Sequence, residues 1–152
     1  MSEDGPNLVR GTLMDDEDID EFLRAQGHGT LTLADDGETY GVPISFGYDG
    51  ERLYMKLIRY GDESVKFDFV DTTDRASVVT YDIPGRFEWE SVIVRGELRD
   101  INQVEAEHVK EAIAENAWFP PGTFSESEPA TQVRWLALDI DEATGRQGVA
   151  SK

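Results

Sequence analysis

The chain has 152 residues and a formal net charge of −18, because 32 acidic residues outnumber 14 basic ones. A negative field of this size repels nucleic acid and anionic membranes, so we expect neither as a partner. Cysteine is absent, which excludes disulfides, thiolate metal sites and cysteine nucleophiles.

The acidic composition is also poor in lysine, with only Lys56, Lys66, Lys110 and Lys152. Such a surface keeps a protein soluble in concentrated salt, where the Debye length falls to about 3 Å near 1 M, so we expect a halophilic source. The N-terminus has no apolar signal region, and no apolar run approaches the roughly 18 residues of a spanning helix, so we expect a cytoplasmic protein. The length suits a single domain over residues 1–152, with 1–11 and 147–152 as disordered arms.

The first element is a short amphipathic helix that follows Asp15. Ile19, Phe22 and Leu23 are spaced three and four residues apart, which is the helical period. Acidic residues at the start favour the positive helix N-terminus, and Gly27 suits a C-terminal cap.

A three-stranded meander is predicted next. Apolar residues alternate through residues 31–33, 42–46 and 53–57, the period of strands with one buried face. Asp36-Gly37 and Asp49-Gly50 separate these runs, and Asp-Gly tolerates the positive φ of hairpin turns. A short helix, Ser64–Val70, follows the third strand.

Two further strands are predicted in the middle of the chain. The first, Arg75–Asp82, ends at the Pro84-Gly85 turn signal, and the second is the long run Phe87–Ile101. Gly96 in the middle of a strand indicates a bulge or a close neighbour.

The last third of the chain contains one helix and one strand. Asn102 and Glu105 have capping-box spacing and begin a helix that runs to about Asn116. Proline breaks Trp118–Phe124, which we expect to be a packing or covering loop. Val133–Ile140 is the final strand, and from Asp141 the polar chain is expected to fray.

Six strands with few, peripheral helices predict a mainly β fold, and a small antiparallel barrel in particular. A sandwich is the alternative. The long fifth strand with its glycine favours a sheet that bends and closes.

A cluster of cations stands out in this acidic chain. Lys56, Arg59 and Lys66 lie within eleven residues, with Ser64 beside Lys66. A phosphate monoester requires donors from side chains, hydroxyls and a helix N-terminus, and this segment offers all three. The alternative is that these residues are solvated and only offset nearby acids.

Other candidates are less specific. Ser91, next to Val92, is either an exposed serine on a core strand or a donor to the polar edge of a planar ligand. Trp118, Phe119 and Phe124 suit the core or a dimer contact, or else a cofactor wall. The two histidines are 80 residues apart without ligand spacing, so no metal site is predicted. No glycine-rich nucleotide motif is present.

Several segments, in this order, resemble the pyridoxamine 5′-phosphate oxidase-like family of flavin-binding split β-barrels. The matching segments are Gly29–Leu33, Tyr40–Phe46, Leu53–Lys56, Ser64–Lys66, Trp89–Gly96 and Trp135–Arg146. The resemblance implies a six-stranded antiparallel split β-barrel. It also implies a homodimer with FMN held at the subunit interface.

The resemblance also implies the roles of individual residues. Pro43, Ile44 and Ser45 would line the flavin ring, and Ser91 with Val92 would address its polar edge. Met55 and Lys56 would lie along the ribityl chain. Ser64 and Lys66 would hold the phosphate, and for Arg59 the same role is inferred from its charge.

The chain lacks the basic residues that true pyridoxamine 5′-phosphate oxidases have near Tyr40 and Ser45, and Arg146 lies near the expected frayed end. We therefore expect an FMN-dependent oxidoreductase of flavin reductase or nitroreductase type, acting on an unknown small molecule. Flavin supplies the redox chemistry, so no general acid or base is required. The alternatives are a reductase using 8-hydroxy-5-deazaflavin and a non-catalytic flavin or haem carrier.

Overall fold

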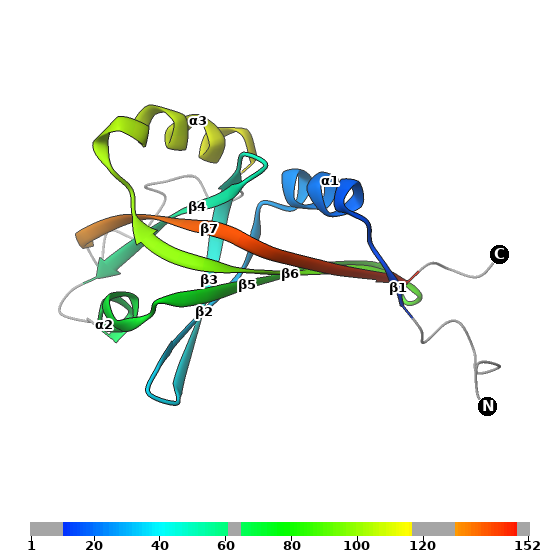
Figure 1. Ribbon diagram of the computed structural model, residues 1–152, viewed down its shortest axis with the longest axis horizontal. Helices are drawn as coiled ribbons and strands as arrows, with labels where there is room; N and C mark the ends of the chain where they lie inside the picture. The colour runs from blue at the N-terminus through cyan, green and yellow to red at the C-terminus, as the bar shows by residue number, and fades with distance from the viewer. Residues whose placement is uncertain (1–10, 61–64, 117–129, 149–152) are drawn as a thin grey trace.

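The computed structural model describes residues 11–60, 65–116 and 130–148, and Figure 1 shows a strongly twisted sheet with helices at its outside and at one end. The elements are β1 (Thr12–Leu13), α1 (Asp16–Gln26), β2 (His28–Asp35), β3 (Glu38–Tyr48), β4 (Arg52–Tyr60), α2 (Val65–Thr72), β5 (Arg75–Gly85), β6 (Glu88–Asp100), the short 3₁₀ helix η3 (Gln103–Glu105), α3 (Ala106–Asn116) and β7 (Ala130–Gly148). Among these residues, no helix is long and apolar enough to cross a bilayer.

The sheet closes on itself. Its order is β1-β7-β4-β3-β2-β5-β6, and β6 pairs again with β7, so β2 to β7 form a ring of six strands to which the short β1 is added. Every pair of neighbours is antiparallel. The expected antiparallel, mainly β fold with peripheral helices is confirmed, and the closed ring argues against the sandwich.

The core fills the inside of the ring. Alternate residues of each strand point inward, which places a set of apolar side chains in one cluster. Its fully buried strand members include Leu31, Leu33, Phe46, Leu53, Met55, Val78, Val92, Val94, Leu136 and Leu138. The period-two pattern in the sequence is the pattern of this inward face.

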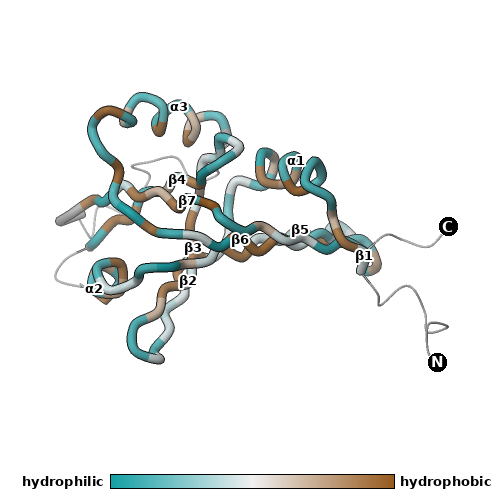
Figure 2. The backbone as a smooth tube through the Cα atoms, viewed as in Figure 1, coloured by the Kyte–Doolittle hydropathy of each residue, from teal (hydrophilic) through white to brown (hydrophobic). Residues whose placement is uncertain are grey.

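Helix α1 has the caps expected from the sequence. The Asp15 side chain accepts a hydrogen bond from the backbone N–H of Asp18, and Gly27 ends the helix at φ 68°. Ile19, Phe22 and Leu23 are buried. Figure 2 shows the apolar side of α1 turned toward the strands.

Helix α3 covers the outer side of β3 and β4 (Figure 1). The capping box between Asn102 and Glu105 is present, although the first turn is 3₁₀ rather than α-helical. The helix packs directly on Gly47, where an added Cβ would lie 2.5 Å from the backbone carbonyl carbon of Ala112. Glycine at this position therefore permits the close approach of helix and strand.

The hairpin turns and the bulge that the sequence predicts are also present in the structure. Asp36 and Gly37 adopt φ 48° and 85°, and Gly50 adopts 98°. The β6–β7 register shifts between Arg95 and Gly96, as expected for a bulge.

The end of the chain is where the prediction was wrong. The last strand does not end at Ile140, and the chain does not fray from Asp141, because β7 continues to Gly148 along β6. Gly145 is buried, so close to Met14 that an added Cβ would lie 2.7 Å from its sulfur. Arg146 is thus part of an ordered strand, opposite Ser91.

The remaining differences are smaller. The helix expected over Ser64–Val70 extends to Thr72, and the strand expected to end at Asp82 extends to Gly85 with a register shift. The predicted loop Trp118–Phe124 lies outside the described residues, as does most of the two predicted arms.

Candidate functional site

Strands β3 and β4 pair over only part of their length. Their register runs from the Tyr48–Leu53 pair to the Phe46–Met55 pair and stops there, although both strands are described in full. Beyond this point β3 pairs with β2, while β4 pairs with β7 as far as Tyr60. The ring is therefore open between Glu38–Ser45 of β3 and Lys56–Tyr60 of β4, which we call the β3–β4 split.

Helix α2 closes one part of this open edge. The Lys66 ammonium donates a 2.7 Å hydrogen bond to the backbone carbonyl of Ile58 on β4. A strand edge without a partner strand needs such donors. Lys66 thus lies at the β3–β4 split, half-buried, and is not directed into open solvent.

Two arginines lie against the ring of Phe67 on α2. The guanidinium carbon of Arg59 is 6.0 Å from the ring centroid, and that of Arg134 is 5.6 Å from it. Arg134 also donates to Asp71 at 2.6 Å and to Asp100 at 3.0 Å. Sequence reasoning missed Arg134, because an isolated arginine in a strand gives no signal until β7 is placed beside β4.

Lys56 lies on the outer side of β4, beside Trp135 of β7. Its ammonium is 5.3 Å from the Trp135 ring centroid, a distance typical of a cation–π contact. Lys56 makes no ion pair with a carboxylate in the described part of the chain. The sequence alone indicates Trp135 only as part of the closing strand.

Two of the three predicted serines, Ser45 and Ser91, lie on strands that are not neighbours. Ser45, on β3, donates to the Gly27 carbonyl at 3.2 Å, and Pro43 is exposed on the same strand. Ser91 lies on β6, separated from β3 by β2 and β5. In the six-stranded ring β6 lies opposite β3, so Ser45 and Ser91 come from opposite sides of the ring.

Three other predicted residues point into the core. Ile44, Met55 and Val92 are 3%, 0% and 0% exposed. Met55 and Val92 also have a paired strand on both sides, whereas Ile44 is paired only with β2 and has an open backbone edge toward the split. Ser64 lies outside the described residues.

The two histidines lie apart: His28 is paired with Ser45 of β3, and His108 lies at the Asp49 turn. His108 Nε2 is 2.8 Å from Asp49 Oδ2, and Tyr54 Oη donates to the same oxygen at 2.6 Å. Burial would raise the pKa of Asp49, but hydrogen bonds from Tyr54, His108 and two backbone amides lower it to about 2. Within the described residues, no three potential metal ligands gather in one place.

Comparison with solved structures gives the same fold. A FAD-binding protein from Mesorhizobium loti has a TM-score of 0.70 at 21% identity, and the match covers 93% of this chain and 100% of that one. The FAD-binding protein from Mycobacterium smegmatis has a TM-score of 0.68 at 17% identity, covering 92% and 100%. At these identities the likeness shows the fold alone.

Two curated relatives match at the level of sequence. An uncharacterized protein of Rhizobium meliloti is 23% identical over 150 residues, covering 92% of this chain and 97% of its own. The 5a,11a-dehydrotetracycline/5a,11a-dehydrooxytetracycline reductase of Streptomyces rimosus is 42% identical over 67 residues, covering 43% and 47%.

The family model described as pyridoxamine 5′-phosphate oxidase matches residues 15–147, which is most of the chain. That range runs from the N-cap of α1 almost to the end of β7 and includes both borders of the β3–β4 split. The chain belongs to the pyridoxamine 5′-phosphate oxidase family.

Proposed function

We propose that this chain is an FMN-dependent oxidoreductase that binds its cofactor along the β3–β4 split as a homodimer. The observation that carries the proposal is the position of its cations: Lys56, Arg59 and Lys66 lie on the two elements that border the open edge, β4 and α2. The names of similar proteins support flavin chemistry. Two proteins with similar solved structures are FAD-binding proteins, and one relative in sequence is a reductase.

The donors at the split suit an anionic cofactor. A phosphate monoester carries nearly two negative charges and binds best to several charged donors and a helix N-terminus. Lys66 lies in the first turn of α2, and Arg59 comes from the neighbouring strand. In this proposal they hold the phosphate together with Ser64. A phosphate site of this kind favours FMN, because FMN ends in a phosphate monoester.

The edge of β3 would hold the flavin ring. Beyond Phe46 the β3 backbone has no β4 partner, so N–H and C=O groups around Pro43, Ile44 and Ser45 are available to the polar atoms of a planar ligand. Lys56 would follow the ribityl chain, next to Met55, where the pairing of β3 and β4 ends. Bound FMN would supply the two-electron redox chemistry, while these residues bind it, orient it and exclude water.

A second copy of the chain would complete the site. Ser91 and Val92 lie on β6, across the ring from β3, and in this proposal they reach the flavin from a partner subunit. The outer side of β5 and β6 around Ser91 exposes Tyr81 and Ile93 at 58% and 44%. Exposed apolar side chains grouped in this way are typical of an interaction surface.

The proposed reaction is reduction of a small organic molecule, as in a flavin reductase or nitroreductase. No residue at the split has to act as general acid or base, since the redox step belongs to the cofactor. The sequence departures near Tyr40 and Ser45 argue against pyridoxamine 5′-phosphate oxidation.

The decisive experiment is an absorption spectrum of the purified chain, with chromatography of the cofactor released on denaturation. We expect flavin bands near about 375 and 450 nm and release of FMN. A single band near about 420 nm would indicate a deazaflavin instead, and a sharp Soret band would indicate haem. Release of FAD would leave the flavin assignment but contradict the phosphate assignment.

The dimer is tested separately by analytical ultracentrifugation of the loaded protein. We expect twice the chain mass of 17.0 kDa. A colourless protein that takes up no FMN would contradict the function. A flavin-loaded monomer would contradict only the shared site.

A further inference from the structure

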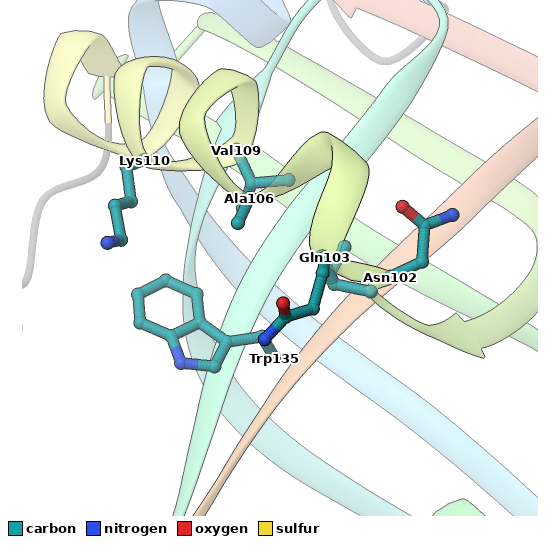
Figure 3. A pocket seen from close by; sticks show the side chains of 7 residues that line it. Asn102, Gln103, Ala106, Val109, Lys110 and Trp135 are labelled. Carbon is teal, nitrogen blue, oxygen red and sulfur yellow. The ribbon is translucent and has the colours of Figure 1, made fainter.

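A groove lies between the start of α3 and the outer side of β7. It has a volume of about 170 Å³ and is lined by Ile101, Asn102, Gln103, Ala106, Val109, Lys110 and Trp135. Figure 3 shows the Trp135 indole below the helix, with Lys110 reaching toward it from α3 and the Gln103 amide at its other side. We call this the Trp135 groove.

The groove has a firm apolar floor. Val109 is 1% exposed and belongs to a small second core with Tyr54 and Ala137, against which Ile101 and Trp135 pack. The backbone N–H of Ile101 donates to the Trp135 carbonyl at 3.0 Å, which fixes the two walls relative to each other. The groove is therefore a formed surface, as expected of a ligand site.

Its size suits one aromatic ring. Apolar cavities of about 150 Å³ bind benzene in a protein core, and the Trp135 groove has a similar volume. The half-buried indole offers a face for offset stacking of a second ring.

One lysine, Lys110, lines this groove, and a second, Lys56, contacts its Trp135 wall. The Lys56 ammonium lies 5.3 Å from the Trp135 ring centroid, and Lys110 is part of the wall. Neither one forms an ion pair with a carboxylate of residues 11–60, 65–116 or 130–148. Glu105, the acidic residue of η3, is paired with Arg99 at 2.6 Å.

The geometry points to a binding site for a monocyclic aromatic anion in the Trp135 groove. The ring stacks on Trp135, and its carboxylate or phosphate pairs with the ammonium of Lys110. Lys56 adds positive charge on the side of β4. The long-range field of a chain with net charge −18 opposes such binding, but at physiological salt it is screened beyond about 8 Å. The inference shares Lys56 with the proposed flavin site, but its stacking ring and its ion-pair partner, Trp135 and Lys110, belong to β7 and α3.

The test is a titration of the full chain with benzoate, followed by ¹⁵N–¹H NMR at neutral pH and physiological salt. We expect saturable shifts of the Trp135 indole N–H and of the Ala106 and Val109 amides, with a dissociation constant in the millimolar range for so small a ligand. Benzamide tests the charge, and cyclohexanecarboxylate tests the ring. Both should bind more weakly than benzoate.

Variants distinguish binding in the Trp135 groove from nonspecific attraction of an anion to positive charge. Lys110→Gln should weaken benzoate binding about threefold, as for an exposed ion pair, and Trp135→Leu about tenfold. Arg86→Gln, which removes an exposed cation from the β5–β6 turn, should change nothing. The inference is overturned by non-saturable shifts, by equal binding of benzamide or cyclohexanecarboxylate, or by equal losses in Arg86→Gln and Lys110→Gln.

Discussion

The ammonium of Lys66 donates a 2.7 Å hydrogen bond to the backbone carbonyl of Ile58. This bond attaches α2 to β4 where β4 no longer has β3 beside it. The residue proposed to bind phosphate therefore also helps to shape the open edge. These two contributions can be separated by experiment.

Replacing Lys66 with Gln should weaken FMN binding by about 1.5–3 kcal/mol, the value of a hydrogen bond to a charged group. Riboflavin, which lacks the phosphate, should lose much less affinity. Flavin fluorescence titrations of both ligands against the native chain and the variant measure the difference. Equal losses for FMN and riboflavin would assign Lys66 to shaping the split alone. Arg86→Gln serves as the control for a lost positive charge.

The free energy of unfolding should depend on pH through the ionisation of Asp49. Its pKa of about 2 in the folded protein is below the ordinary value of 3.8, so its stabilising effect is present above about pH 4 and is lost as the pH falls through 2. Asp49→Asn should lower the free energy of unfolding by about 2 kcal/mol at pH 7. The difference between native chain and variant should shrink toward pH 2.

Urea unfolding at a series of pH values measures this effect. Asp35→Asn is a matched control, because Asp35 is exposed at the end of β2 and makes no side-chain hydrogen bond or ion pair with the described residues. A constant difference between native chain and Asp49→Asn over the whole pH range would contradict the prediction.

Gly96→Ala should destabilise the ring strongly. At Gly96 an added Cβ would lie 1.9 Å from the carbonyl oxygen of Asp139, which belongs to the backbone and cannot rotate away. We expect a loss of at least about 3 kcal/mol, the upper end for overpacking. Gly41→Ala is the control, since its Cβ would meet only Thr30 at an ordinary 3.5 Å. Thermal unfolding of both variants would show the contrast, and equal melting temperatures would refute it.

Salt should stabilise the protein. With a net charge of −18, mutual repulsion of surface carboxylates opposes the compact state, and raising the salt from about 0.1 M to about 1 M shortens the Debye length from about 10 Å to 3 Å. Urea unfolding at the two concentrations should give a higher free energy of unfolding in the concentrated salt. An unchanged or lower value would contradict the expected halophilic character.

The features that local sequence predicted well are those with a local physical cause. The Asp36-Gly37 turn requires positive φ, and α1 begins with a cap at Asp15. Apolar residues such as Leu53 and Met55 are buried on the inward face of the strands. Each of these requirements involves residues close in the chain. The mainly β fold was expected from these features and is confirmed. The family resemblance came from the order of the matching segments, and it is confirmed as well.

The features that local sequence could not predict depend on pairing between distant segments. The polar end of the chain reads as a loose tail, yet Arg146 is held in β7 by its place opposite Ser91 on β6. In the same way, Lys56 and Trp135 are neighbours only because β4 and β7 pair. Contacts between distant segments determine the order of strands in the closed sheet. They also determine where the pairing of β3 with β4 ends. These contacts position the candidate site and the Trp135 groove.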